Sequence, residues 1–425
     1  MITTGFASLG IGTSVCRALA EIGYERPTPI QSRAIPELLA GRDLLGIAQT
    51  GTGKTAAFVL PILEMLMANR AKAKPRCPTV LILAPTRELA AQIAAEIASF
   101  ARHTPVRHAC IFGGVGHNPQ IRTLSLGVEI LVATPGRLLD LAESGHVDLG
   151  RISHLVLDEA DRLMDMGFIR DVRRIIRLLP RDRQSLLFSA TMPGEVAGLA
   201  DEMLNRPVRV EVSPERVTLE QIEQGVLVVA NDRKHAALQK LLFDPAVTRA
   251  IVFTRTKHGA NRVAKKLDGA GIAAEVIHGN KSQNARTRAL ESFKSGRVWV
   301  LVATDIAARG IDVDGISHVI NFELPHEPES YVHRIGRTAR AGASGVAWSL
   351  VDPSEMKRLK AIEKLTKVRP SPLQIDLLQS GAEQGDPSES GGRRARHRSA
   401  DAGRGSDRRG RRRSRRGRSG RKRAA

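Results

Sequence analysis

The sequence predicts an α/β protein with two tandem parallel-sheet domains, a short linker and a disordered basic C-terminal tail. Its 425 residues are enough for two or three domains that each bury a core. In both halves, short apolar runs alternate with helical patterns, which is typical of βαβ units around a parallel sheet. Of the net charge of +21, +14 falls in residues 393–425, which hold fifteen arginines and almost no apolar residues.

The expected strands are short aliphatic runs. In the first half they cover residues 44–47, 80–83, 129–132, 155–157 and 185–188, and in the second half 251–253, 274–277, 298–302, 318–322 and 346–350. Helices are expected over residues 56–67, 87–100, 262–267 and 285–293. The clearest is 87–100, where Leu89, Ile93 and Ile97 form one apolar stripe. A polar segment with a proline places the hinge near residues 208–222.

Composition excludes several classes of protein. With 42% apolar and 26% charged residues the chain is of ordinary globular type, and no apolar run approaches the roughly 20 residues of a membrane span. Residues 1–10 show no secretory signal. Cys16, Cys77 and Cys110 lie far apart without a CxxC pair, so we expect reduced thiols and a cytoplasmic protein. Aromatic residues are only 3%, which argues against a platform that stacks bases.

The strongest motif is a glycine-rich loop between the expected strand 44–47 and the helix 56–67. It reads Ala48-Gln49-Thr50-Gly51-Thr52-Gly53-Lys54-Thr55. Such a loop gathers backbone N–H groups around one concavity at a helix N-terminus, which suits a phosphate chain. Lys54 would neutralise phosphate charge, and the Thr55 hydroxyl would bind Mg²⁺. A mere strand-to-helix turn would not explain the Gly-Lys-Thr ending.

Carboxylates and arginines complete the chemistry of phosphoryl transfer. Asp158 and Glu159 directly follow the apolar run 155–157. Open parallel sheets bind their ligands in a crevice at the carboxyl ends of the strands, so we expect both carboxylates to face that crevice. Asp158 would hold Mg²⁺, and Glu159 would orient and deprotonate a water molecule. Arg337 and Arg340 are three residues apart, so they would clamp the γ-phosphate from one helical turn. The alternatives are an acidic helix start and a solvated basic face.

Taken in order, these motifs resemble those of DEAD-box ATP-dependent RNA helicases over about residues 6–355. Residues 48–55 match the family's AxTGxGKT form, in which alanine comes first. The resemblance implies that ATP and Mg²⁺ are the cofactors. It also implies that the nucleotide is bound by a Q-motif segment and by part of the second domain, through Phe6, Tyr24, Arg26, Pro29, Gln31, Gly310 and Asp312.

The resemblance further implies which residues bind RNA and which couple its binding to hydrolysis. The RNA-binding set is Pro85, Thr86, Arg87, Gly114, Thr134, Pro135, Gly136, Arg137, Arg255 and Thr304. The coupling set is Asp161, Ser189, Thr191 and His333. Residues 253–260 and 277–283 look like the bacterial RhlE-type subgroup. One departure is Ala339, where the family usually has glycine, so hydrolysis is expected to be somewhat altered.

The family likeness implies a Q-motif segment (residues 1–32), two RecA-like domains (33–210 and 223–370), a linker (211–222) and the tail (380–425). The expected function is RNA-stimulated ATP hydrolysis that unwinds short duplexes, in ribosome assembly or RNA turnover. The tail would bind RNA or proteins of those processes. Two alternatives stay open: an RNA-binding scaffold that uses ATP as a clamp, and a DNA helicase.

Overall fold

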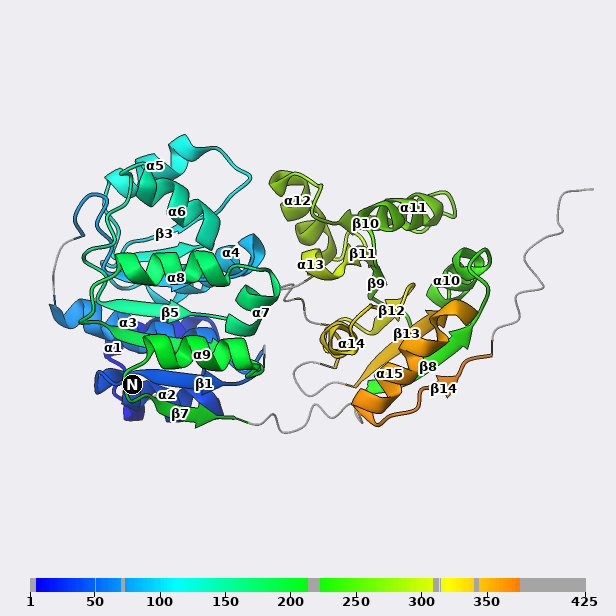
Figure 1. The fold of residues 1–425 in the computed structure, drawn as a ribbon, viewed down its shortest axis with the longest axis horizontal. Coiled ribbons are helices and arrows are strands. Elements are labelled where there is room, and N and C mark those ends of the chain that lie inside the picture. Colours follow the sequence, from blue (N-terminus) through cyan, green and yellow to red (C-terminus); the bar gives the residue numbers. More distant parts are fainter. Residues whose placement is uncertain are drawn as a thin grey trace, which may run out of the picture. The chain divides into compact units, whose positions relative to one another are not determined.

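The computed structural model describes residues 5–49, 51–69, 73–212, 222–308, 313, 315–339 and 344–374. All of them lie in one compact unit, residues 1–378. This part of the chain contains two seven-stranded sheets (Figure 1). The predicted α/β fold with two parallel sheets is therefore confirmed, while the expected tail lies outside the described residues.

The first sheet has the strand order β3-β4-β2-β5-β6-β1-β7. Its strands are β1 (Leu44–Ile47), β2 (Val80–Leu83), β3 (His108–Ile111), β4 (Ile130–Ala133), β5 (His154–Leu157), β6 (Gln184–Ser189) and β7 (Val208–Glu211). Every pairing is parallel. The carboxyl ends of all seven strands therefore meet at one edge, where ligand sites of such sheets lie.

Helices cover both faces of the first sheet. They are α1 (Thr13–Glu21), α2 (Pro29–Leu39), α3 (Lys54–Asn69), α4 (Arg87–Phe100), α5 (His117–Ser125), α6 (Pro135–Glu143), α7 (Ala160–Asp165), α8 (Ile169–Leu178) and α9 (Gly194–Met203). Helix α4 has the predicted bounds, and Leu89, Ile93 and Ile97 are buried on its core face. Its N-cap is Thr86, whose hydroxyl accepts a hydrogen bond from the Leu89 N–H.

The second sheet repeats this plan with the order β10-β11-β9-β12-β13-β8-β14. Its strands are β8 (Ile222–Val228), β9 (Ala250–Thr254), β10 (Ala274–Ile277), β11 (Val300–Thr304), β12 (His318–Asn321), β13 (Gly345–Val351) and β14 (Ser371–Pro372). Its helices are α10 (Lys234–Leu242), α11 (Lys257–Asp268), α12 (Gln283–Lys294), α13 (Asp305–Ala308), α14 (Pro328–Ile335) and α15 (Met356–Thr366), with a 3₁₀ turn at Pro353–Glu355. All pairings are again parallel.

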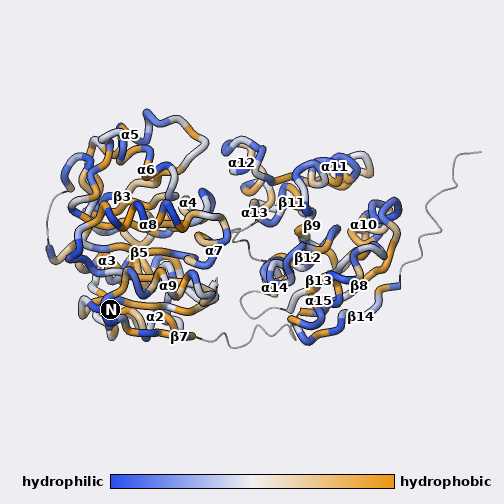
Figure 2. The backbone as a smooth tube through the Cα atoms, viewed as in Figure 1, coloured by the Kyte–Doolittle hydropathy of each residue, from blue (hydrophilic) through white to orange (hydrophobic). Residues whose placement is uncertain are grey.

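Most of the central strands are hydrophobic along their length because helices bury both of their faces (Figure 2). In β2, Val80 and Ile82 pack into one core, and Leu81 and Leu83 pack into the other. This continuous burial is why most strands could be predicted from the sequence, although β11 begins two residues later than expected. Among the described residues, no helix is both long and apolar enough to cross a membrane.

Four strands escaped the sequence prediction, namely the two-residue strand β14 and the strands β3, β7 and β8. Strands β3 and β7 lie at the edges of the first sheet, and β8 lies next to the edge of the second. These strands carry charged or polar residues among their apolar ones, so they lack a clear apolar run. The correction matters most for the hinge, expected near 208–222, because residues 208–211 form β7 and residue 222 begins β8.

Candidate functional site

The phosphate loop follows β1 at the carboxyl edge of the first sheet. Ala48 is buried, and its N–H donates to the Ser189 carbonyl at 3.0 Å, which fixes the loop to the end of β6. Gly51 and Gly53 have φ values of 86° and 88°, a left-handed conformation that a side chain disfavours. A Cβ on Gly53 would also collide with the Gln31 amide. The loop therefore requires its glycines; Thr50 lies outside the described residues.

Lys54 begins α3 and points into a buried environment. Its side chain is 6% exposed, and its Nζ has no hydrogen-bond partner among the residues that the structure describes. A buried ammonium group without a partner is costly, which favours an anion at this position. Thr55 follows, half-buried, in the first turn of the same helix. Both residues fit the phosphates and Mg²⁺ predicted from the sequence.

Asp158 and Glu159 follow β5, separated from the phosphate loop by β6. Burial raises the pKa of Asp158 to about 6, against the opposing effect of the Lys54 ammonium. A carboxylate and a hydroxyl are oxygen donors of the kind that Mg²⁺ takes, with its remaining ligands from water and phosphate. Asp158 and Thr55 therefore fit such a cation, although the described residues contain no cluster of three potential metal ligands.

Glu159 is held as an ionised group in a strained conformation. Its φ of 52° is left-handed, and its carboxylate accepts from Arg162 Nη1 at 2.6 Å. Burial works against ionisation of the carboxyl group, but Arg162, Lys54 and Arg337 outweigh it and hold the pKa below the usual value. Arg162 was not predicted from the sequence; its position three residues after Glu159 on α7 is the signal that could have found it.

The side chain of Gln31 bridges α2 and the phosphate loop. Its Oε1 accepts from the Thr28 N–H at 2.8 Å, and its Nε2 donates to the Gly53 carbonyl at 3.1 Å. The ring of Phe6, expected at the nucleotide, is instead fully buried in the core. Tyr24 packs edge-to-face on Phe100, with the ring centroids 5.7 Å apart. Arg26 and Pro29, which were also predicted to bind nucleotide, are exposed.

The predicted coupling residues of the first domain form one hydrogen-bonded cluster. Asp161 Oδ2 accepts from the N–H and the hydroxyl of Thr191, both at 2.9 Å. The Asp161 N–H donates to Ser189 Oγ at 3.1 Å, and Ser189 Oγ donates to the Thr191 carbonyl at 2.7 Å. Asp161 is thus hydrogen-bonded to Ser189 and Thr191, and the Ser189 carbonyl is in turn hydrogen-bonded to Ala48 of the phosphate loop.

The predicted RNA-binding residues of the first domain follow the neighbouring strands β2, β3 and β4. Arg87 lies so close to Gly114 that a Cβ on this glycine would collide with the guanidinium group. Arg137 is buried, and its Nη2 donates to the Val115 carbonyl at 3.0 Å. Its Nη1 has no hydrogen-bond partner in the described part of the chain. The remaining predicted RNA-binding residues of the first domain lie at or just before the starts of helices α4 and α6: Pro85, Thr86, Thr134, Pro135 and Gly136.

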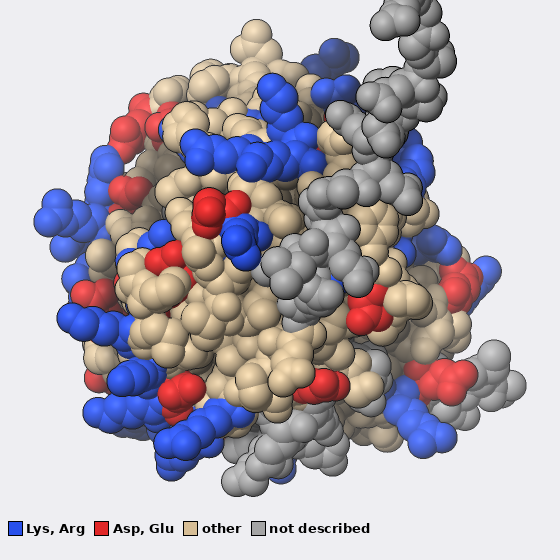
Figure 3. Space-filling model, turned by 90° about the vertical axis from the view of Figure 1, so that its right-hand side faces the viewer, with Lys and Arg blue, Asp and Glu red and all other residues tan. Residues whose placement is uncertain are grey.

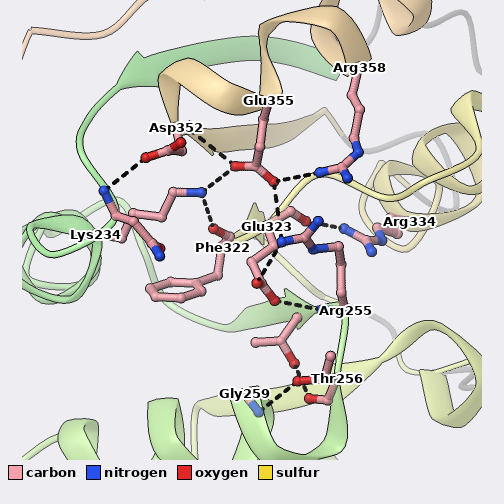
Figure 4. A network of polar contacts seen from close by, with 12 residues as sticks. Lys234, Arg255, Thr256, Gly259, Phe322, Glu323, Arg334, Asp352, Glu355 and Arg358 are labelled. Carbon is pink, nitrogen blue, oxygen red and sulfur yellow. Dashed lines mark hydrogen bonds and ion pairs between the residues drawn. The ribbon is translucent and has the colours of Figure 1, made fainter.

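In the second domain, Arg255 follows β9 and Thr304 ends β11, so both lie at the carboxyl edge of the sheet. The Arg255 N–H donates to Glu323 Oε2 at 2.8 Å, and its Nη2 donates to Glu323 Oε1 at 3.2 Å (Figure 4). Glu323 was not singled out in the sequence.

Arg337, one of the two arginines predicted to clamp the γ-phosphate, follows helix α14. Arg337 is 5% exposed, and its Nε donates to the His333 carbonyl at 3.2 Å. Its charge contributes to the low pKa of Glu159, which belongs to the first domain. A cavity of 380 Å³ is lined from the first domain by Gln49, Arg162, Ala190 and Thr191, and from the second by Glu329, Val332, His333, Gly336, Arg337 and Leu365. Gly310, Asp312 and Arg340 lie outside the described residues.

Ala339 adopts a left-handed conformation with a φ of 54° and is buried. For a residue with a Cβ this conformation costs roughly 1–2 kcal/mol, a penalty that glycine does not have. The backbone itself therefore explains why a glycine is usual here, and the strain lies between the two predicted clamp residues Arg337 and Arg340.

Comparisons with known proteins identify the family of the chain. Residues 28–199 match the DEAD/DEAH box helicase family, and residues 233–342 match the helicase conserved C-terminal domain. The DEAD-box ATP-dependent RNA helicase CshA of Geobacillus kaustophilus is 44% identical over 364 residues, which are 86% of this chain and 77% of that protein. CshA of Bacillus subtilis is 42% identical over 368 residues, 86% of this chain and 73% of that protein.

Solved structures give the same result. Dbp5 of S. cerevisiae bound to RNA and ADP BeF3 is similar with a TM-score of 0.76 at 32% identity, over 87% of this chain and 95% of that chain. The helicase Mss116 bound to ssRNA and UDP-BeF has a TM-score of 0.76 at 27% identity, over 86% of this chain and 78% of that chain. Because the relatives reported above carry the name CshA, the expected RhlE-type subgroup is not supported.

Proposed function

Since this chain belongs to the DEAD-box family of ATP-dependent RNA helicases, we propose that Glu159 activates the water that attacks ATP. Lys54, Thr55 and Asp158 would hold the phosphates together with Mg²⁺. The observation that carries this proposal is the buried, unpartnered Nζ of Lys54 beside a glutamate that three cations keep ionised. An ionised carboxylate is the form that can accept a proton.

The proposed steps use only groups at the two sheet edges. The Glu159 carboxylate orients the water and takes its proton, while Arg162 holds that carboxylate in place. Bound Mg²⁺ supplies positive charge next to the phosphate oxygens. Arg337, with Arg340, stabilises the charge that develops on the transferred phosphoryl group. Turnover then requires both domains, because neither sheet holds the complete set of groups.

We assign the base of ATP to the Q-motif segment, with Gln31 as its central residue. The Gln31 amide keeps a second N–H and a second acceptor lone pair beyond its contacts to Thr28 and Gly53. Because Gln31 also contacts the Gly53 carbonyl, binding of the base would affect the phosphate loop. Gln49, Thr50, Gly51 and Thr52 would surround the phosphates, and Gly310 with Asp312 would reach the nucleotide from the second domain.

RNA would bind along the carboxyl edges of both sheets through its backbone. Dbp5 and Mss116, whose structures contain RNA and a nucleotide, support this assignment. On the face of the second domain shown in Figure 3, basic and acidic side chains are interspersed, with a stripe of basic side chains across the upper part. The affinity for RNA would therefore depend on individual residues at the sheet edges, such as Arg87, Arg137 and Arg255. Asp161, Ser189, Thr191 and His333 would couple RNA binding to hydrolysis.

The test is steady-state ATPase activity without polymer, with single-stranded RNA and with single-stranded DNA, for the wild type and for Glu159→Gln. We expect stimulation by RNA alone, and near-complete loss of turnover with intact ATP and RNA binding in the variant. Glu195→Gln is the matched control, because Glu195 is an exposed carboxylate in the same domain. Wild-type turnover by Glu159→Gln would contradict the assigned base, and equal stimulation by DNA would favour a DNA helicase.

We also propose that the enzyme works in the cytoplasm, in ribosome assembly or RNA turnover, and that residues 380–425 tether RNA or partner proteins. The charge of the tail supports this proposal, and so do three free cysteines. Deleting residues 380–425 should leave RNA-free ATPase activity unchanged but weaken RNA binding and flatten its salt dependence, since each phosphate contact contributes about −0.7 to the log–log slope. Anisotropy titrations at several salt concentrations would measure this slope. Equal slopes for both proteins would exclude an RNA tether and leave protein docking.

A further inference from the structure

A continuous belt of charged groups runs along the carboxyl edge of the second sheet. The strands β11, β9, β12, β13 and β8 are adjacent in that order. Each is followed by a residue of the belt: Asp305 after β11, Arg255 after β9, Glu323 after β12, Glu355 after β13 and Lys234 after β8. Most of this belt is visible in Figure 4. The parallel sheet thus joins residues that are up to 121 positions apart in the sequence.

Glu323 occupies the centre of the belt and holds two arginines at once. Its carboxylate accepts from the N–H and the Nη2 of Arg255, at 2.8 and 3.2 Å. Its backbone carbonyl accepts from Arg334 Nη1 at 2.7 Å. Arg255 is the proposed RNA contact, and Arg334 belongs to helix α14, which leads into the arginine clamp. A single residue therefore touches the groups that serve both substrates.

The two residues that precede Glu323 are held by buried polar contacts. The Phe322 carbonyl accepts from Lys234 Nζ at 3.0 Å, and the same ammonium forms an ion pair with Glu355 at 2.5 Å. The side chains of Lys234 and Glu355 are only 1% and 4% exposed. Asn321 Oδ1 accepts from Arg334 Nη1 at 3.0 Å. Residues 321 and 322 are thus anchored, so that any adjustment begins at Glu323.

Arg334 in turn is rigidly placed. It forms a two-fold ion pair with Asp305, Nε to Oδ1 at 2.5 Å and Nη2 to Oδ2 at 2.8 Å, and its guanidinium lies 5.1 Å from the ring centroid of Phe253. Arg337 follows three residues later, less than one helical turn away. A change in the contacts of Arg334 is therefore transmitted over a short distance to the clamp.

We propose that Glu323 is a positioning residue that couples RNA binding at Arg255 to the arginine clamp at Arg337. This inference rests on the proposed function of both arginines. A phosphate that binds Arg255 competes with the Glu323 carboxylate for the guanidinium N–H groups. The carboxylate must then adjust, and the residue whose carbonyl orients Arg334 adjusts with it. By linkage, nucleotide binding that orders the clamp strengthens RNA binding by the same factor.

The test measures this factor directly in the full-length protein. The affinity for a non-hydrolysable ATP analogue is determined with and without saturating single-stranded RNA, and the ratio is the coupling factor. In Glu323→Gln, which keeps the shape but removes the charge, we expect the coupling factor to fall by about 5-fold or more, since such factors span about 5- to 150-fold. The affinity without RNA should change by less than about 2-fold.

Three further variants make the result specific. Glu327→Gln is the matched control, because Glu327 is an exposed carboxylate four residues along the same segment, and its coupling factor should equal that of the wild type. In an Arg255→Gln background, Glu323→Gln should have no additional effect, because the pair is already broken. Glu323→Asp keeps the charge and provides a second variant if Glu323→Gln does not fold.

The possible outcomes separate this inference from the proposed function. A wild-type coupling factor in Glu323→Gln overturns the inference, and so does an equal loss of affinity with and without RNA, which would indicate a purely structural role. If the wild type itself shows no coupling between RNA and nucleotide, the proposed function of Arg255 and Arg337 fails instead.

Discussion

The buried ion pair between Lys234 and Glu355 gives a quantitative prediction about the second domain. At 2.5 Å and an effective dielectric constant of about 20, the two charges attract each other by about 7 kcal/mol. Removing both from water costs several kcal/mol for each ion, so the net contribution of the intact pair is small. Breaking the pair is a different matter, because one charge then stays buried without its partner.

The two single substitutions should therefore differ. Glu355→Leu leaves Lys234 Nζ with one acceptor, the Phe322 carbonyl, and should lower the free energy of unfolding by about 3–5 kcal/mol. Lys234→Met leaves Glu355 with donors from Asp352 and Arg358, so the loss should be smaller, about 1–3 kcal/mol. The double variant should be more stable than the sum of the two losses predicts, because no unpaired charge remains.

Urea denaturation followed by tryptophan fluorescence measures these losses. The chain has two tryptophans, Trp299 and Trp348, and both belong to the second domain, so the signal reports this domain alone. With a slope of about 2 kcal/mol/M, Glu355→Leu should shift the midpoint by about 2 M. Lys360→Met, at an exposed position of α15, is the control and should change stability by less than about 0.5 kcal/mol. Strictly additive losses, or a loss below about 1 kcal/mol for Glu355→Leu, would refute the reasoning.

Four further predictions concern single residues. Gln31→Ala leaves the Thr28 N–H and the Gly53 carbonyl unpaired, and it should raise the KM for ATP by on the order of 10-fold and remove the preference over GTP; a retained preference would restrict Gln31 to a structural role. Arg337→Ala should lower kcat by on the order of 10³ with little change in nucleotide affinity, and unchanged single-turnover rates would exclude it from the clamp. Ala339→Gly removes the strain at a φ of 54° and should stabilise the second domain by on the order of 1 kcal/mol in the same urea assay, whereas destabilisation would argue against that strain. Burial, together with Lys266 and Arg262, lowers the pKa of His235 to about 4. Between about pH 6.5 and 4 the native state therefore binds fewer protons than the unfolded chain, so the protein loses stability as the pH falls through this range. His235→Asn should flatten this part of the stability–pH profile, and identical profiles for variant and wild type would count against the low pKa.

Local sequence patterns were sufficient for most of the fold. The stripe of Leu89, Ile93 and Ile97 gave α4 its correct bounds, because periodicity reports burial directly. Central strands were visible for the same reason. Edge strands such as β7 have only one neighbouring strand and carry charged residues, so no apolar run marked them, and part of the first sheet was taken for the hinge.

The candidate site divides in the same way. Contiguous motifs predicted the phosphate loop, the acidic pair and the arginine clamp. Glu323 and Glu355 could not be found, because their partners are 68 and 121 positions away in the sequence and meet only through the order of the strands. The inward contacts of Gln31 and the burial of Phe6 likewise depend on tertiary packing, which a motif does not specify.

The parallel arrangement of both sheets also has a practical consequence for labelling and for evolution. Apart from the Q-motif segment, which precedes β1, the described residues of the proposed sites lie at the carboxyl ends of the strands or on helices that start there. The loops before the strands, such as residues 144–153 and 180–183 in the first domain and 244–249 and 269–273 in the second, hold none of them. Inserted segments can accumulate in these loops without changing the chemistry. Fluorescent dyes attached there would leave both proposed substrate sites untouched.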